Sequence, residues 1–96
     1  MSKTVVIKKS TKPDKKLMAV FDIDGKKRIT HFGATGYKDY TSGATEEQRK
    51  AYRSRHAKDL DTNDPTRAGY LSYYILWSEK SLKDAISKYK KRFGFS

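Results

Sequence analysis

Residues 64–77 read DPTRAGYLSYYILW, the only long run in the chain that is apolar or aromatic on every side when wound as a helix. Asp64 is a typical helix N-cap residue, and Pro65 suits the first helical position because it has no N–H to lose and its φ is already helical. A helix without a polar side must be covered by other elements or by a partner. The sequence therefore predicts a central helix over residues 65–77, which is too short to span a bilayer.

The rings of this predicted helix allow two interpretations. Helical periodicity places Tyr70, Tyr74 and Trp77 on one stripe. A buried core helix explains such a stripe most simply. The alternative is that some tyrosine hydroxyls, or Trp77, reach a surface that serves self-association or stacking on nucleic acid.

Composition restricts the class of protein. The chain has 96 residues, the size of one domain, so we expect a single domain over residues 1–96. Its 22 Lys and Arg residues against 11 Asp and Glu give a net charge of +11, which favours polyanionic partners. Cysteine is absent, which excludes disulfides and thiolate-bound zinc. No apolar run is typical of a signal peptide or a transmembrane segment, so we expect a soluble, intracellular protein without a membrane partner.

The first third of the chain predicts a small antiparallel sheet. Residues 1–16 form a lysine-rich arm around one short strand, and residues 17–34 form a β-hairpin whose turn contains Asp24-Gly25. A three-residue loop would pair Phe21 with Ile29, whereas a two-residue loop would pair Phe21 with Arg28. We prefer the three-residue loop.

A glycine-rich loop over residues 35–44 leads to the first predicted helix, residues 45–58. Thr45 and Gln48 have the spacing of a capping box, in which each side chain binds the backbone N–H of the other residue. This helix is basic and has a thin apolar seam. Its inward-facing candidates are Ala51 and Tyr52.

The last predicted helix covers residues 81–93, with Ser81 as N-cap and Gly94 after its end. Five apolar residues share one face of it at helical spacing: Leu82, Ala85, Ile86, Tyr89 and Phe93. The expected fold is therefore α+β, with a small antiparallel sheet (N-terminal strand plus β-hairpin) followed by three helices. The Tyr/Trp-rich second helix is the centre of this arrangement.

Basic residues gather in four segments: the arm, the hairpin tip, the first helix and the last helix. Several basic surfaces on one compact domain suit a phosphate backbone, which can be bridged or wrapped. The predicted phosphate contacts are Lys26, Lys27, Arg28, Arg49, Arg53, Arg55, Lys90, Lys91 and Arg92, with Lys8 and Lys9 as auxiliary contacts.

His31 and His56, with Asp39 as an orienting carboxylate, would form an acid/base or metal site if folding brought them together. Two histidines without any cysteine are few ligands for a metal ion. We therefore expect no catalytic residues, no metal and no cofactor, and leave the roles of these three residues open.

The chain also resembles small basic proteins of nucleocytoplasmic large DNA viruses, the marseilleviruses and their relatives, over residues 17–93. The resemblance rests on His31-Phe32-Gly33-Ala34, Gly36, Asp39-Tyr40-Thr41, Tyr52, Arg55-His56, Asp64-Pro65-Thr66, Ala68-Gly69 and Leu76-Trp77. It implies an abundant, virion-associated DNA-binding protein that helps to compact the genome, found in the virion and in the viral factory of the host cytoplasm or in the host nucleus. It implies no established active site.

The leading hypothesis is an architectural protein that binds double-stranded DNA with little sequence preference and bends or condenses it. The alternative is an interaction protein that forms homo-oligomers through its Tyr/Trp helix and binds RNA or acidic proteins. A metal-dependent nuclease using the two histidines is the third hypothesis. No signature of an RNA-binding module is present.

Overall fold

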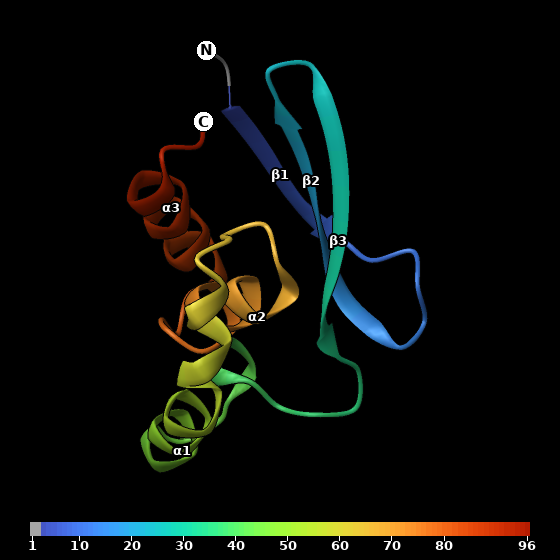
Figure 1. Cartoon of the computed structure of the whole chain (residues 1–96). Coiled ribbons are helices and arrows are strands. Elements are labelled where there is room, and N and C mark those ends of the chain that lie inside the picture. The colour runs from blue at the N-terminus through green and yellow to red at the C-terminus, as the bar shows by residue number, and fades with distance from the viewer. Residues whose placement is uncertain (1–2) are drawn as a thin grey trace.

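A three-stranded antiparallel sheet in the order β1-β2-β3 forms one layer of the protein. The computed structural model describes residues 3–96; Met1 and Ser2 of the predicted arm lie outside the described residues. The strands are β1 (Lys3–Lys9), β2 (Lys15–Ile23) and β3 (Lys26–Ala34). All helices lie on one side of this sheet (Figure 1). The predicted α+β class is therefore confirmed.

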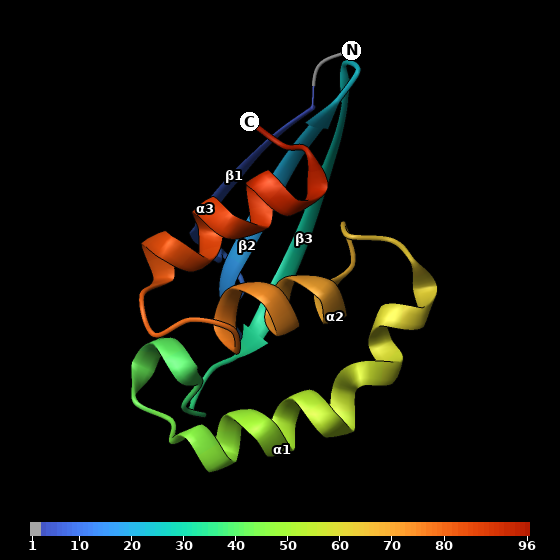
Figure 2. The ribbon, with the colours of Figure 1, turned by 90° about the vertical axis from the view of Figure 1, so that its left-hand side faces the viewer.

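Helical segments follow the sheet in sequence. They are η1 (Tyr40–Ser42), α1 (Glu46–His56), η2 (Ala57–Thr62), α2 (Ala68–Leu71), η3 (Ser72–Leu76) and α3 (Leu82–Phe93). α2 and α3 lie against the sheet, whereas α1 lies beyond the end of β3 (Figure 2). Among residues 3–96, none of these helices has the length and apolar character that crossing a bilayer requires.

The core lies between the sheet and the α2–η3 and α3 segments. Every second strand residue faces it, so Val5, Phe21 and Phe32 are almost fully buried. The opposite sheet face is open, and the paired residues Val6, Val20 and Ile29 form an apolar row across it. The core is thus one-sided, as expected for an antiparallel sheet.

The hairpin has a two-residue turn, so the preferred three-residue loop was wrong. Ile23 pairs with Lys26 and Phe21 pairs with Arg28. Asp24 and Gly25 both have positive φ, +52° and +85°. Turns of this kind match the twist of the flanking strands, and an Asp-Gly pair adopts them at little cost. Strand β2 also begins at Lys15, two residues before the predicted start of the hairpin.

The central helix starts three residues later than predicted, at Ala68. Asp64 caps a turn instead, because its carboxylate accepts hydrogen bonds from the Thr66 N–H and hydroxyl. The Pro65 carbonyl accepts a hydrogen bond from the Tyr89 hydroxyl. Burial raises the pKa of this hydroxyl. The Thr66 carbonyl accepts a hydrogen bond from the Thr30 hydroxyl at 2.8 Å. Tertiary partners therefore occupy the carbonyls that would otherwise begin the helix.

The second half of the central helix winds as a π-helix, η3, which ends with the Trp77 N–H bound to the Ser72 carbonyl. The wider turn separates the predicted Tyr70, Tyr74 and Trp77 stripe. The first two rings contact Phe93 of α3, whereas Trp77 stacks on Tyr52 of α1. An i→i+5 turn shifts every later side chain around the axis, and such turns are frequent at functional sites.

The other two helices agree closely with the sequence. The capping box of Thr45 and Gln48 is formed, and α1 ends at His56, two residues early. Ser81 caps α3, and its five apolar residues pack on the core or lie within it. Of the inward candidates in α1, Tyr52 is half-buried but Ala51 is exposed. That part of the prediction was wrong because only one edge of α1 contacts the rest of the protein.

Candidate nucleic-acid interface

Ion pairs neutralise few of the cationic side chains. Only four of the 22 Lys and Arg residues form an ion pair within residues 3–96, and all four pairs join side chains to Asp or Glu. Side chains that need no internal partner remain available to external anions. The four are Lys16, Arg49, Arg67 and Lys88.

Two of the predicted basic segments lie at the same end of the molecule. The β2–β3 hairpin tip and the C-terminal end of α3 both point towards the chain ends (Figures 1 and 2). Lys3 links them, because it pairs with Ile23 beside the tip and its Nζ donates to the Phe93 carbonyl at 3.2 Å. We call this set the hairpin-end cluster: Lys26, Lys27, Arg28, Lys90, Lys91 and Arg92.

The hairpin-end cluster is largely solvent-exposed, and only Lys90 is half-buried. Arg92 lies over the Tyr74 ring, with its guanidinium carbon 5.0 Å from the ring centroid. The basic residues of α3 also favour the negative end of the helix dipole, so part of their placement is structural. The other three cations, Lys26, Lys27 and Arg28, are exposed on the hairpin, and Arg28 is near enough to Asp64 for its charge to lower the pKa of that carboxyl.

The three predicted arginines of α1 have different environments. Arg53 donates to the Tyr73 and Trp77 carbonyls at 3.4 Å and to Ser78 Oγ at 2.8 Å. Arg49 donates to the Ser78 carbonyl and pairs with Glu46. Both therefore fix the end of η3 to α1.

Arg55 differs from these two, because its side chain is exposed and forms no ion pair within residues 3–96. The auxiliary candidates Lys8 and Lys9 end strand β1 and are also exposed. They and α1 lie away from the hairpin tip (Figure 1). The predicted contacts are consequently divided between distant parts of a molecule whose longest dimension is 39 Å.

His31, His56 and Asp39 do not form a common site, because each contacts a different partner. His31 Nδ1 lies 2.7 Å from Ser10 Oγ, and His56 Nδ1 lies 3.0 Å from Asp59 Oδ2. Asp39 is buried and binds Lys16 Nζ at 2.8 Å. Within residues 3–96, no three His, Cys, Asp or Glu side chains gather as metal ligands.

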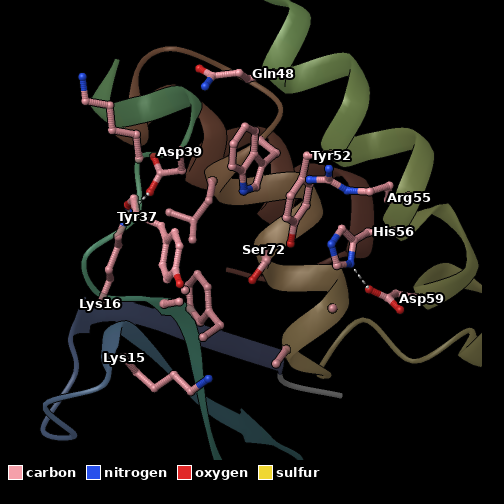
Figure 3. A pocket seen from close by; sticks show the side chains of 18 of the residues that line it. Lys15, Lys16, Tyr37, Asp39, Gln48, Tyr52, Arg55, His56, Asp59 and Ser72 are labelled. Carbon is pink, nitrogen blue, oxygen red and sulfur yellow. Dashed lines mark hydrogen bonds and ion pairs between the residues drawn. The ribbon is translucent and has the colours of Figure 1, made fainter. Parts of the chain in front are cut away.

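A cleft of about 620 Å³ lies between α1, the α2–η3 segment and the loop after β3 (Figure 3). Tyr52 of α1 forms part of its wall, between His56 at 4.1 Å and Trp77 at 4.4 Å between ring centroids. Burial raises the pKa of the Tyr52 hydroxyl, and its hydrogen bond with Ser72 partly offsets that effect. The stack is therefore a fixed aromatic wall with a neutral hydroxyl.

Sequence reasoning did not identify this cleft. Of the predicted contacts only Arg55 lines it; it is joined by Lys15, Lys38 and the exposed Tyr37. The spacing of Tyr52, Arg55 and His56 along one helix edge was the available signal. The stacking of Trp77 on Tyr52 could not be predicted from the sequence, because the π-helical turn sets the direction of the Trp77 side chain.

Fold and charge together define an α+β protein with helices on one face of a three-stranded sheet and unpaired cations at distant points of its surface. The chain belongs to the family of unknown function DUF5754, whose family model matches residues 5–56. That region comprises most of β1, all of β2 and β3, and α1. No curated protein and no solved structure matches the chain.

Proposed function

We propose that this protein is an architectural DNA-binding protein that contacts duplex DNA through phosphates, with little sequence preference, and bends or condenses it. The observation that carries the proposal is the position of its unpaired cations. The hairpin-end cluster lies at one end of the molecule, and Lys8, Lys9 and Arg55 lie elsewhere on its surface. Cationic surfaces that are far apart can bind two DNA segments or successive turns of one.

The hairpin gives the cluster a suitable shape for this partner. Lys26 and Lys27 are exposed on a two-stranded projection that extends past the helices (Figure 2). A two-stranded ribbon has the width of the DNA major groove, and flexible lysines reach the phosphates beside it. Phosphate contacts carry no sequence information, which accounts for the expected lack of preference.

The resemblance to proteins of large DNA viruses extends this proposal to a biological setting. The DNA would then be a viral genome, and the protein would act in the virion and the viral factory. A protein that neutralises phosphates at several points is suited to genome compaction.

A salt titration with duplexes of unrelated sequence tests the proposal. If about 6 to 8 phosphates are neutralised, the logarithm of affinity should fall against the logarithm of salt concentration with a slope of roughly −5 to −7. Imaging of long DNA at saturating protein should show compacted molecules. A slope near about −1, or one strongly preferred sequence, would contradict the proposal.

Lys27→Ala and Lys83→Ala form a matched pair for this titration. Each removes one exposed lysine, but only Lys27 belongs to the hairpin-end cluster. We expect Lys27→Ala to weaken binding equally for all duplexes and to make the salt slope shallower by about 1. Lys83→Ala should leave the slope unchanged, and equal effects of the two variants would argue against a defined interface.

The alternative, an interaction protein that oligomerises through its Tyr/Trp helix, has less support. Tyr70 is buried, and Tyr74 and Trp77 contact rings of α3 and α1. Their apolar surface is thus used mainly inside the molecule. Light scattering without nucleic acid should give a monomer, whereas a stable oligomer that prefers an acidic protein to duplex DNA would favour the alternative.

A further inference from the structure

The cleft beside the Tyr52–Trp77 stack has the features of a small-molecule site. Its volume of about 620 Å³ falls within the range of roughly 300–1,000 Å³ that ligand pockets occupy. Phe32 and Leu76, both buried, form part of its lining, and Ser72 supplies a hydroxyl. The lining is mixed, because charged side chains stand beside these apolar and aromatic residues, so the cleft can hold a ligand that has both a ring and a charged group.

The charges around the cleft favour an anion. Its two carboxylates are already engaged, Asp39 by Lys16 and Asp59 by His56. Three more cations line the cleft and form no ion pair within residues 3–96, namely Lys15, Lys38 and Arg55. The lining thus carries four Lys and Arg side chains against two carboxylates, so its net charge is positive and favours an anionic group.

The shape of the wall favours a flat ring. Tyr52 and Trp77 stack face to face with an angle of 7° between their planes, and His56 covers the other face of Tyr52. Among residues 3–96 no second ring stacks on Trp77, so its outer face is the flat surface that the stack offers to the cleft. Tyr37, which is 75% exposed, lies on the other side of the cleft (Figure 3). Aromatic side chains of this kind contribute about 1–3 kcal/mol per base when a nucleobase stacks on them.

We propose that this cleft is a nucleotide-binding site, in which the aromatic side chains receive an unpaired base and Lys15, Lys38 and Arg55 hold its phosphate. A ring together with an anion is what distinguishes a nucleotide from a sugar phosphate or a fatty acid. Arg55 is suited to phosphate because its planar guanidinium can donate two parallel hydrogen bonds. The cleft shares Arg55 with the proposed duplex contacts but none of the hairpin-end cluster, so either proposal can fail alone.

Intrinsic fluorescence tests the site directly because Trp77 is the only tryptophan of the chain and lines the cleft. AMP should change its emission with saturation, adenosine should bind at least about tenfold more weakly, and inorganic phosphate should cause no change. Two results would overturn the proposal: no saturable change up to about 10 mM AMP, or the same change with phosphate alone.

Arg55→Ala and Lys50→Ala are the matched variants. Both residues are exposed on α1 and both changes remove one positive charge, but only Arg55 lines the cleft. We expect about a tenfold loss of AMP affinity for Arg55→Ala and none for Lys50→Ala. Equal affinities of the two variants would show that the cleft does not hold the phosphate.

The site could take a free nucleotide or an unpaired base within a nucleic-acid strand. Comparing the affinities for AMP, for an eight-residue single-stranded oligodeoxyadenylate and for its duplex distinguishes the two. Tighter binding of the single strand than of AMP identifies an unpaired base within a strand, and tighter binding of AMP identifies a free nucleotide. Binding of the duplex alone would overturn the proposal. Lys27→Ala should weaken duplex binding and leave AMP binding unchanged, which separates this site from the architectural interface.

Discussion

At the scale of single residues, a positive charge has different uses according to its surroundings. Arg53 and Arg55 carry the same charge, yet Arg53 donates to two carbonyls and a hydroxyl at the end of η3. Arg55 is exposed at the edge of the cleft and forms no ion pair within residues 3–96. The guanidinium of Arg53 also lies 4.1 Å from the centroid of the Tyr73 ring. Arg53 therefore stabilises the fold, whereas Arg55 is exposed at the cleft in which we propose a nucleotide site.

Arg53→Lys should destabilise the fold by about 1–2 kcal/mol, because a lysine keeps the charge but cannot reach three acceptors or stack its plane on Tyr73. Urea unfolding measures this loss. Arg55→Lys serves as the control and should change stability by less than about 0.5 kcal/mol. Equal stability of both variants would show that charge alone matters at position 53.

Asp64 should make the fold sensitive to acid. The hydrogen bond from the Thr66 hydroxyl lowers the pKa of the Asp64 carboxyl, and the charges of Arg28 and Arg67 act in the same direction. The stabilisation is therefore complete above the unfolded-state pKa of about 3.9 and is lost as the pH falls through the lower folded-state value. The difference in unfolding free energy between wild type and Asp64→Asn should shrink from about pH 7 to about pH 2. A constant difference would contradict this role.

At the scale of elements, the contact between β3 and η3 depends on a glycine. Gly33 has a φ of +81°, and a Cβ atom there would lie 2.7 Å from Leu76 Cδ1, closer than such atoms approach. The absent side chain lets η3 lie directly on the strand, and Leu76 also lines the cleft. A glycine-rich loop was predicted to begin just after this position, but the reason for Gly33 itself is a tertiary contact.

Gly33→Ala should destabilise the protein by about 2–3 kcal/mol, because of the positive φ and because the Leu76 methyl group must shift. Gly36→Ala is the control, because Gly36 has a similar φ of +86° but no atom within 4 Å of the added Cβ. It should cost only about 1 kcal/mol. Thermal unfolding of the two variants measures the difference, and equal losses would mean that the close packing of η3 is unimportant.

At the scale of the whole molecule, the C-terminal residues complete the core and the sheet. Phe95 is buried against Phe21, with their ring centroids 5.3 Å apart. The Ser96 N–H donates to the Lys3 carbonyl at 2.8 Å, and the Val5 N–H donates to the Ser96 carbonyl at 3.2 Å. Residues more than ninety positions apart thus pair along the edge of β1, which shields that edge.

Phe95→Ala should lower the free energy of unfolding by about 3 kcal/mol, since it removes a large buried ring. Ser96→Ala keeps the backbone pairing and should have little effect. Chemical denaturation of both proteins measures the two values. A small loss for Phe95→Ala would show that the end of the chain lies on the core without contributing to it.

Local signals in the sequence were enough to predict four elements: the Asp-Gly hairpin, the capping box of α1, the Ser81 cap and the apolar face of α3. Each depends on residues a few positions apart, so neighbouring side chains and backbone groups decide them. Contacts across the fold set where the central helix begins, where it takes the π-helical turn, and why Tyr74 meets α3 while Trp77 meets α1. These contacts also divided the predicted arginines into structural and exposed ones and formed the cleft. These features depend on carbonyls, rings and guanidinium groups that are far apart in the sequence and meet only in the fold. Which of these groups contact one another is not encoded in the periodicity of the sequence, so it could not be predicted from it.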